Sequence, residues 1–350
     1  MAPQRSEQKS SLQDSERPPT MADVARLAQV STAAVSYFLS GQTDQLRRVG
    51  AEAQERIREA VETLGYVRNK TARHLRLQRT ERICLLMPKL GIPFADKMAH
   101  DVDAVARNHG FSSIVVTASG EDAYRRVLRD VEMGLADGII ADANGLEPDE
   151  ISRLFETFSS VNRACLVIHP TAKGKGFSVL NYDWNGALSD ALEHLVAAGH
   201  TRVAYIQNRT RSPNPRAKLA RDFIASRGLP EPVVLDGAQN REAVAIAARE
   251  IAAASHPRPT AVLVESDFTA VTVIEELQRR GLSVPGDVAV IGCGNAEEGY
   301  YCNPRLTTIG PTWLSITEAA EHLIDIMQKG GKTTPRRFTI PWTLYIRESG

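Results

Sequence analysis

Residues 20–40, TMADVARLAQVSTAAVSYFLS, are predicted to form two short amphipathic helices joined by a tight turn, and the rest of the chain is arranged around this pair. Thr20 can cap the first helix together with Asp23, an acidic residue three positions later, and apolar residues then recur on one helical face. Ser31 closes the turn and is a suitable N-cap for the second helix. The pattern fits a helix-turn-helix, and it also fits an ordinary helical hairpin buried in a larger core.

The second predicted helix has one apolar and one more polar side. Val35, Phe38 and Leu39 would point inward. The opposite side carries small and hydrogen-bonding side chains, namely Ala33, Ser36, Tyr37 and Ser40. An outer face of this kind is suited to the major groove of DNA.

A third helix is predicted over residues 51–64, because apolar residues that include Ile57 and Ala60 share one face and charged residues lie elsewhere. Gly65 stands where a C-terminal cap belongs. Three short helices can close a small core of their own, which favours the helix-turn-helix over a hairpin buried in a larger core.

The blocks DVARLAQVSTAAVSYFLSG, RIREAVETLGYVRN and ARHLR resemble, in order and spacing, the DNA-binding head and hinge of the LacI/GalR (lactose-repressor) family. The resemblance continues through GH at 199–200, VPGDVAVIG at 284–292 and LTTI at 306–309. It implies a small all-α helix-turn-helix head, joined by a hinge helix to an α/β two-lobed periplasmic-binding-protein-like body. It also implies a homodimer that binds near-palindromic, double-stranded operator DNA.

The resemblance assigns DNA contacts to particular positions of this sequence. They are Thr20, Ser31, Thr32, Ala33, Ser36 and Tyr37 in the head, and Asn69, Arg73 and Leu75 in the hinge. In the family a leucine from each subunit wedges into a minor-groove base step, and this role falls on Leu75. Asn69 would cap the hinge helix and meet a phosphate. A segment this short is a marginal helix alone, so in the absence of DNA we expect mostly a solvated linker.

The chain divides into four predicted parts: a disordered tail at 1–18, the head at 19–66, the hinge helix at 67–79, and the effector-binding and dimerisation body at 80–350. The family fold implies that the chain crosses three times between the lobes of the body. One lobe would comprise roughly residues 80–181 and 309–330, and the other residues 182–308 and 331–350.

Charge is distributed unevenly along a chain whose formal net charge is zero. Residues 1–79 hold 13 Lys and Arg against 9 Asp and Glu, which leaves 29 against 33 in the rest. A locally basic module on a mildly acidic body is typical of a site-specific DNA-binding protein. No apolar stretch approaches the length of a membrane span and no signal-peptide core is present, so we expect a cytoplasmic protein that acts away from membranes.

In the body, apolar strand-like runs alternate with amphipathic helical segments. The strands are predicted at 82–87, 112–118, 137–141, 163–168, 202–207, 232–236, 260–265 and 287–292, with a final strand at 337–346. The helices are predicted at 97–108, 123–133, 185–198 and 243–253. Continuous apolar strands between helices predict parallel sheets covered on both faces. The strands divide into two lobes near residues 181–183.

A ligand of such a body lies between the lobes, outside the carboxyl ends of the strands. The effector-binding candidates are Phe94, Asp142, His169, Arg216, Asp267 and Asn295. Arg216 aligns with an arginine that family members place on an effector's hydroxyls or carboxylate. Where many members have Gly-x-Asp-Asp, residues 292–295 read Gly-Cys-Gly-Asn, so an acceptor for sugar hydroxyls is missing. The effector is predicted to be a small molecule, with sugars and their derivatives among the candidates.

Enzymatic alternatives find little support in the motifs. The glycines at 292 and 294 follow a strand but lack the third glycine and the acidic partner of a dinucleotide site. His194 and His200 do not share a helical face, so neither a metal site nor a cofactor is predicted. The chain is interpreted as a ligand-responsive transcriptional regulator, most often a repressor in this family. The alternative is a cytoplasmic small-molecule-binding protein or a sugar-processing enzyme with an accessory helical head.

Overall fold

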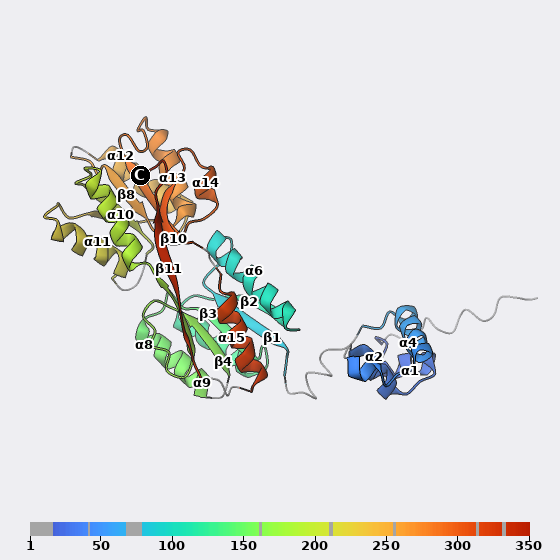
Figure 1. Cartoon of the computed structure of the whole chain (residues 1–350). Coiled ribbons are helices and arrows are strands. Elements are labelled where there is room, and N and C mark those ends of the chain that lie inside the picture. Colours follow the sequence, from blue (N-terminus) through green and yellow to red (C-terminus); the bar gives the residue numbers. More distant parts are fainter. Residues whose placement is uncertain are drawn as a thin grey trace, which may run out of the picture. The chain divides into compact units, whose positions relative to one another are not determined.

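A computed structural model describes residues 17–40, 43–67, 79–160, 163–209, 213–254, 257–312, 315–330 and 334–350. The chain forms two compact units, a head at residues 1–78 and a body at residues 79–350 (Figure 1). Most of the predicted tail and hinge, residues 1–16 and 68–78, lies outside the described residues. None of the described helices is long and apolar enough to cross a membrane.

The head contains the three predicted helices, α1 (Met21–Ala28), α2 (Thr32–Ser40) and α4 (Ala51–Leu64), and a short additional helix α3 (Thr43–Leu46). The Asp23 carboxylate accepts hydrogen bonds from the backbone N–H of Thr20 at 2.9 Å and from its hydroxyl at 2.6 Å. Ser31 Oγ accepts from the N–H of Ala34 at 3.1 Å at the start of α2. These contacts confirm the predicted caps at the N-termini of α1 and α2.

A small apolar core holds these helices together. Val24 and Ala28 of α1, Val35 of α2 and Ile57 and Ala60 of α4 are almost completely buried in one cluster. Helix α1 packs against both α2 and α4. The head is therefore a separate module with its own core, as the helix-turn-helix interpretation requires.

The body contains strands in the order β2-β1-β3-β4-β5-β11-β10-β9-β8-β6-β7, and every pairing is parallel except that of β10 with β11. Their bounds are β1 Arg82–Met87, β2 Ser112–Thr117, β3 Gly138–Asp142, β4 Ala164–Ile168, β5 Ser178–Asp183, β6 Val203–Gln207, β7 Val233–Asp236, β8 Ala261–Val264, β9 Ala289–Cys293, β10 Thr307–Pro311 and β11 Arg337–Tyr345.

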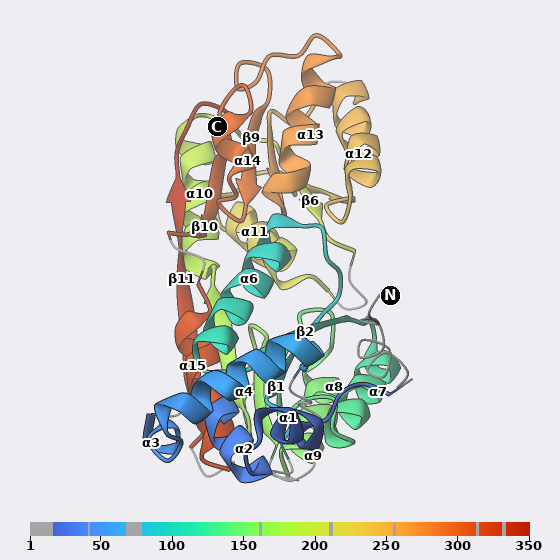
Figure 2. The same ribbon diagram turned by 90° about the vertical axis from the view of Figure 1, so that its right-hand side faces the viewer.

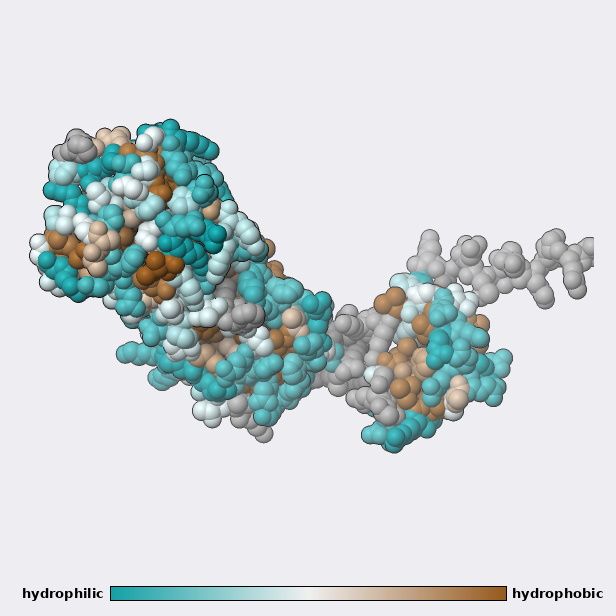
Figure 3. Space-filling model, turned by 45° about the horizontal axis from the view of Figure 1, so that its top comes forward, coloured by the Kyte–Doolittle hydropathy of each residue, from teal (hydrophilic) through white to brown (hydrophobic). Residues whose placement is uncertain are grey.

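In each lobe of the body, helices cover both faces of the β-strands. Their bounds are α6 Pro93–Asn108, α7 Glu121–Glu132, α8 Pro148–Ile151, a π-helical turn Ser152–Glu156, α9 Thr157–Ser160, α10 Asn185–Ala197, α11 Pro215–Ser226, α12 Arg241–Ala253, α13 Asp267–Gln278, α14 Glu298–Tyr301 and α15 Thr317–Gln328. In the first lobe α6 and α15 pack on one face of the sheet and α7 with residues 148–160 on the other. In the second lobe α10 and α11 pack on one face and α12 and α13 on the other. The outer surface shown in Figure 3 is mostly hydrophilic, with small apolar patches.

Strand β11 belongs to both lobes and runs along one side of the body (Figure 2). Residues 337–341 pair in parallel with β5 of the first lobe, whereas residues 342–345 pair antiparallel with β10 of the second. The expected assignment of residues 331–350 to the second lobe alone is therefore wrong. One continuous strand can take part in two sheets because its two ends face different neighbours.

The lobe boundary expected near residues 181–183 is also corrected, because these residues end strand β5, which pairs with β4 in the first lobe. Asn181 and Asp183 interrupt the apolar run, and this interruption resembles a loop in the sequence. Helix α15 packs against α6 and β4, so the chain returns to the first lobe after β10.

Candidate functional site

The start of helix α2 is the most accessible part of the helix-turn-helix. Ser31, Thr32 and Ala33 are exposed, whereas Ser36 and Tyr37 are half-buried. Tyr37 packs against the head core, and the Arg48 guanidinium lies 5.6 Å from the centre of its ring. The five predicted positions therefore share one end and one side of α2, although Tyr37 has a structural contact as well.

Thr20 lies at the other end of the helix pair and is half-buried. Both its hydroxyl and its backbone N–H donate hydrogen bonds to the Asp23 carboxylate. Together these two hydrogen bonds lower the pKa of Asp23 to about 2. The Thr20 oxygen can still accept a hydrogen bond. The hinge candidates Asn69, Arg73 and Leu75 lie outside the described residues.

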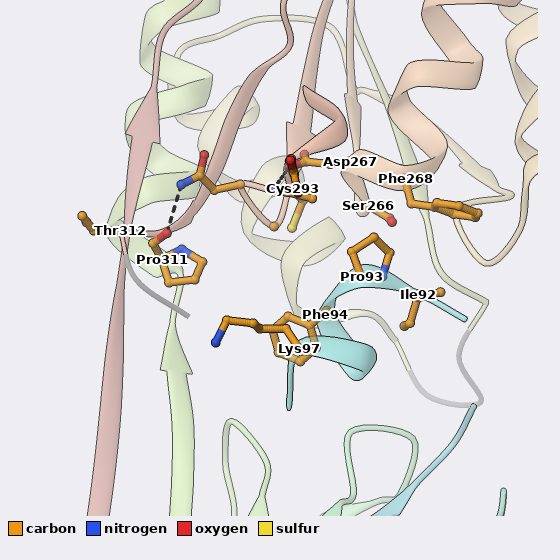
Figure 4. A pocket seen from close by; sticks show the side chains of 14 residues that line it. Ile92, Pro93, Phe94, Lys97, Ser266, Asp267, Phe268, Cys293, Pro311 and Thr312 are labelled. Carbon is orange, nitrogen blue, oxygen red and sulfur yellow. Dashed lines mark hydrogen bonds between the residues drawn. The ribbon is translucent and has the colours of Figure 1, made fainter. Parts of the chain in front are cut away.

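A cavity of about 340 Å³ lies between the two lobes of the body (Figure 4). The first lobe contributes the start of α6. The second contributes the loops that follow β8, β9 and β10, so the cavity lies at the carboxyl ends of parallel strands, where α/β proteins bind ligands. The lining residues are Ile92, Pro93, Phe94, Lys97, Ser266, Asp267, Phe268, Cys293, Gly294, Asn295, Ala296, Glu297, Pro311 and Thr312.

Asp267, a predicted effector ligand, lines this cavity but is only 1% exposed. Its Oδ1 atom accepts from the Thr308 hydroxyl at 2.6 Å, and its Oδ2 atom accepts from the Ala296 N–H at 2.7 Å. Burial raises the pKa of Asp267 to about 6, although these hydrogen bonds act in the opposite direction. The carboxylate therefore connects the start of α13 to β10 and to the loop after β9.

Asn295 also lines the cavity, and its side chain is engaged with the protein. Its Nδ2 group donates to the Pro311 carbonyl at 3.1 Å, and its Oδ1 atom accepts from Arg347 Nη2 at 2.7 Å. Asn295 has φ 51°, a left-handed backbone conformation that asparagine tolerates. Asp267 and Asn295 thus hold the loop in place, and most of their hydrogen-bonding capacity is used in doing so.

Gly292 is packed so closely that a larger residue should destabilise the body. A Cβ atom at this position would lie 2.2 Å from Asp267 Oδ1 and 2.7 Å from Leu306 Cδ2. We expect Gly292→Ala to lower the free energy of unfolding by about 1 to 3 kcal/mol, as overpacking does. Urea denaturation measures this change. Gly186→Ala in α10 is the control, because a Cβ there meets nothing within 4 Å; equal stability of the two variants would contradict the expectation.

Arg216 lies at the start of α11 and is half-buried. Its Nη1 group donates to Cys293 Sγ at 3.1 Å, and Cys293 lines the cavity. The guanidinium carbon lies 5.3 Å from the ring centre of Trp184 and 5.0 Å from that of Trp342. The arginine is therefore held against two aromatic rings beside the cavity.

The aromatic contacts continue from Arg216 to the first lobe. The ring centres of Trp342 and Tyr182 are 6.2 Å apart, and those of Tyr182 and Phe94 are 5.2 Å apart. Phe94, Tyr182, Trp184 and Trp342 are hereafter called the aromatic cluster. Of these residues only Phe94 was predicted. Tyr182 lies in β5 and Trp184 follows it, and the apolar pattern did not predict this strand. Trp342 lies in β11 and contacts the other rings because β11 pairs with strands of both lobes.

Asp142 and His169 lie at the ends of β3 and β4 but do not line the cavity. Asp142 Oδ1 accepts hydrogen bonds from the backbone N–H of Asn144 at 3.2 Å and from the side-chain amide of Asn144 at 2.7 Å. Burial raises the pKa of Asp142 to about 6. His169 Nδ1 accepts from the Thr171 N–H at 3.2 Å, and burial lowers the pKa of His169 to about 4. Of the six predicted effector residues, the cavity thus directly includes Phe94, Asp267 and Asn295, and Arg216 adjoins it.

Comparison with known proteins gives relatives along most of the chain. The HTH-type transcriptional repressor PurR of Vibrio parahaemolyticus serotype O3:K6 is 29% identical over 295 residues, covering 83% of this chain and 86% of that protein. Catabolite control protein A of Priestia megaterium is 25% identical over 311 residues, covering 87% and 91%. The lac repressor dimer bound to operator and the anti-inducer ONPF has the same fold, with a TM-score of 0.78 at 20% identity over 95% of this chain and 99% of that chain.

Family models match both units. The model described as "Bacterial regulatory proteins, lacI family" matches residues 20–69, and the model described as "Periplasmic binding protein-like domain" matches residues 192–350. A helix-turn-helix head and a two-lobed body with an interlobe cavity define a transcriptional regulator with a ligand-binding body. The chain belongs to the LacI/GalR family of such regulators. The fold class predicted from the sequence is confirmed.

Proposed function

We propose that the protein is a homodimeric, cytoplasmic repressor that binds a near-palindromic operator and is controlled by a small-molecule effector between its lobes. The observation that carries this proposal is the exposed start of α2 on a head with its own core. A helix end presented in this way can enter a major groove while α1 lies across the backbone. The PurR relative is named a transcriptional repressor, and we propose no catalytic step for the cavity.

Two heads are needed to read a near-palindromic site, because each half-site occupies one recognition helix. A solved neighbour is described as a lac repressor dimer bound to operator, which supports the homodimer proposed here. In this proposal Leu75 wedges into the minor groove, Asn69 meets a phosphate, and Arg73 adds charge near the backbone.

Within the head, Thr32, Ala33 and Tyr37 are proposed to read base edges, with Thr20, Ser31 and Ser36 contacting the backbone or neighbouring bases. Ala33 offers a methyl contact, whereas the Tyr37 hydroxyl can donate or accept. In the body, Arg216 and Phe94 are proposed to bind the effector. Asp267 and Asn295 remain candidates through their remaining lone pairs, and Asp142 and His169 through their positions at the carboxyl ends of β3 and β4.

Tyr37→Phe tests the proposed base reading while keeping the ring that packs against the core and under Arg48. We expect selection from random DNA to return a half-site altered at one or two positions, with discrimination there reduced by about 1 to 3 kcal/mol. Thermal unfolding of the head should be unchanged. Thr63→Ala, on the outer side of α4, is the matched control and should select the wild-type half-site. The same half-site from Tyr37→Phe would exclude a role for this hydroxyl in sequence reading.

A further inference from the structure

The polar groups expected to hold a sugar are occupied by the protein itself. Each oxygen of Asp267 accepts a hydrogen bond from within the body, and the side chain of Asn295 both donates and accepts. A neutral polyol needs several free donors and acceptors around it, because each of its buried hydroxyls must be paired. The loop after β9 offers little of this capacity without rearrangement.

Within the described part of the chain, Arg216 is in contrast a cation without a strong hydrogen-bond acceptor. Among the described residues, the hydrogen bond that its guanidinium donates goes to the thiol of Cys293, and a thiol is a weak acceptor. The rings of Trp184 and Trp342 stabilise the guanidinium through its faces but accept no hydrogen bond in its plane. The edge of the guanidinium fork is therefore suited to a carboxylate, which it can hold in bidentate geometry.

A buried carboxylate, that of Glu265, directly follows strand β8 and lies near Arg216. Glu265 accepts from the Tyr205 hydroxyl at 2.9 Å, from the Asn208 N–H at 2.7 Å and from Asn214 Nδ2 at 3.1 Å. No salt bridge joins it to Arg216 within the described residues, although the two charges lie close enough to attract each other. Since Glu265 is satisfied by these three donors, a ligand anion would not need to displace it.

The aromatic cluster supplies two further donors. The hydroxyl of Tyr182, a residue that is only 7% exposed, and the indole N–H of Trp342 are buried and have no hydrogen-bond partner within the described part of the chain. An unpaired buried donor is costly, so both groups are suited to an acceptor supplied from outside. Tyr182, Trp342 and Arg216 thus form a chain of contacts beside the cavity.

The remaining walls of the cavity are largely apolar and suit a flat molecule. Phe94 and Phe268 are half-exposed and line the cavity from opposite lobes, and Pro93 and Pro311 complete these walls (Figure 4). A volume of about 340 Å³ matches a compact ligand, at the lower end of the range for small-molecule sites. Aromatic side chains on both sides favour a ring that can stack or pack edge to face.

We propose that the effector is a compact aromatic or heteroaromatic carboxylate, whose anion pairs with Arg216 in place of the Cys293 thiol and whose ring lies between Phe94 and Phe268. This inference rests on the proposed function of the cavity and specifies its ligand. It assigns Tyr182 and Trp342 as additional donors to the carboxylate or to a ring substituent. Neutral sugars are the excluded class.

The test is calorimetric titration of the full-length protein with matched pairs of ring compounds. Benzoate, 4-hydroxybenzoate and nicotinate are the carboxylates, and benzamide, 4-hydroxybenzamide and nicotinamide are their neutral counterparts. We expect at least one carboxylate to bind with millimolar or better affinity and its amide to bind at least about tenfold more weakly, as loss of a charge-assisted hydrogen bond predicts. Absence of carboxylate binding at millimolar concentration, or equal binding of the amide, overturns the proposal.

Variants of the protein test whether the carboxylate binds at Arg216. Arg216→Met should weaken the carboxylate at least about tenfold, whereas Arg216→Lys, which keeps the charge but lacks the fork, should weaken it less. Lys218→Gln, at an exposed position of the same helix, should bind as the wild type does. Circular dichroism confirms that each variant is folded. Wild-type binding by folded Arg216→Met contradicts the proposal, as does tight binding of glucose, ribose or cellobiose.

DNA binding by the wild-type protein separates this inference from the function on which it rests. If the protein binds a selected DNA site but takes a neutral sugar, the regulator stands and the carboxylate is wrong. If it binds the carboxylate but no DNA site can be selected, the ligand class stands and the regulator is wrong.

Discussion

Ile57→Ala is expected to unfold the head and abolish DNA binding while the body stays folded. Ile57 is completely buried and belongs to the small cluster that joins α1, α2 and α4. Truncating a buried isoleucine to alanine costs about 2 to 5 kcal/mol. A module of this size has little stability to lose, because small domains bury a smaller fraction of their surface. The body is a separate compact unit with its own clusters and should be unaffected.

Two readouts separate these effects. Amide hydrogen exchange should show loss of protection across residues 21–64 and unchanged protection in the strands of the body. Binding to a DNA site selected with the wild type should disappear. Glu55→Ala changes an exposed residue of the same helix and should preserve both readouts. Wild-type DNA affinity in Ile57→Ala would show that the head core is not required for recognition.

Asp267 is expected to make the stability of the body depend on pH between about 4 and 6. Burial raises the pKa of Asp267 from its ordinary value of 3.8 to about 6, so the folded protein binds this proton more tightly than the unfolded chain. The contribution of Asp267 to stability therefore falls as the pH rises through this window. At about 1.4 kcal/mol for each pH unit, the total is on the order of 3 kcal/mol.

Asp267→Asn removes the titrating proton and keeps an oxygen that can accept from Thr308 or Ala296. Urea unfolding at pH 4, 5, 6 and 7 should show the variant gaining about 2 kcal/mol relative to the wild type between the lowest and highest pH, because the rest of the change lies outside this range. Asp222→Asn, at an exposed position, controls for a general charge effect and should show no such trend. A difference between Asp267→Asn and the wild type that stays constant with pH would show that burial does not control this carboxyl.

The local sequence pattern was sufficient to predict the helices of the head and most strands of the body. The caps at Thr20 and Ser31 and the bounds of α4 follow from residues a few positions apart, and so the sequence revealed them. Continuous apolar runs likewise located β1 and β4. Strand β5 was not predicted because Asn181 breaks its apolar run.

The cavity depended on contacts that local pattern does not encode. Arg216 meets Cys293, 77 residues away, and Asn295 meets Arg347, 52 residues away. Asp267 was foreseen at a strand end, but its bond to Thr308 depends on how β10 packs beside it. The aromatic cluster required the sharing of β11 between two sheets. Sequence reasoning therefore found residues near the site but could not tell which of them are already satisfied by the protein.

Genome-wide footprinting of the protein in its own cells shows where the chain binds DNA and through which part. We expect a limited set of sites that share a near-palindromic sequence with two half-sites, and we expect these sites to be lost in cells that carry Ile57→Ala. Absence of discrete sites, or sites that persist unchanged with Ile57→Ala, would contradict the assignment of DNA recognition to the helix-turn-helix head.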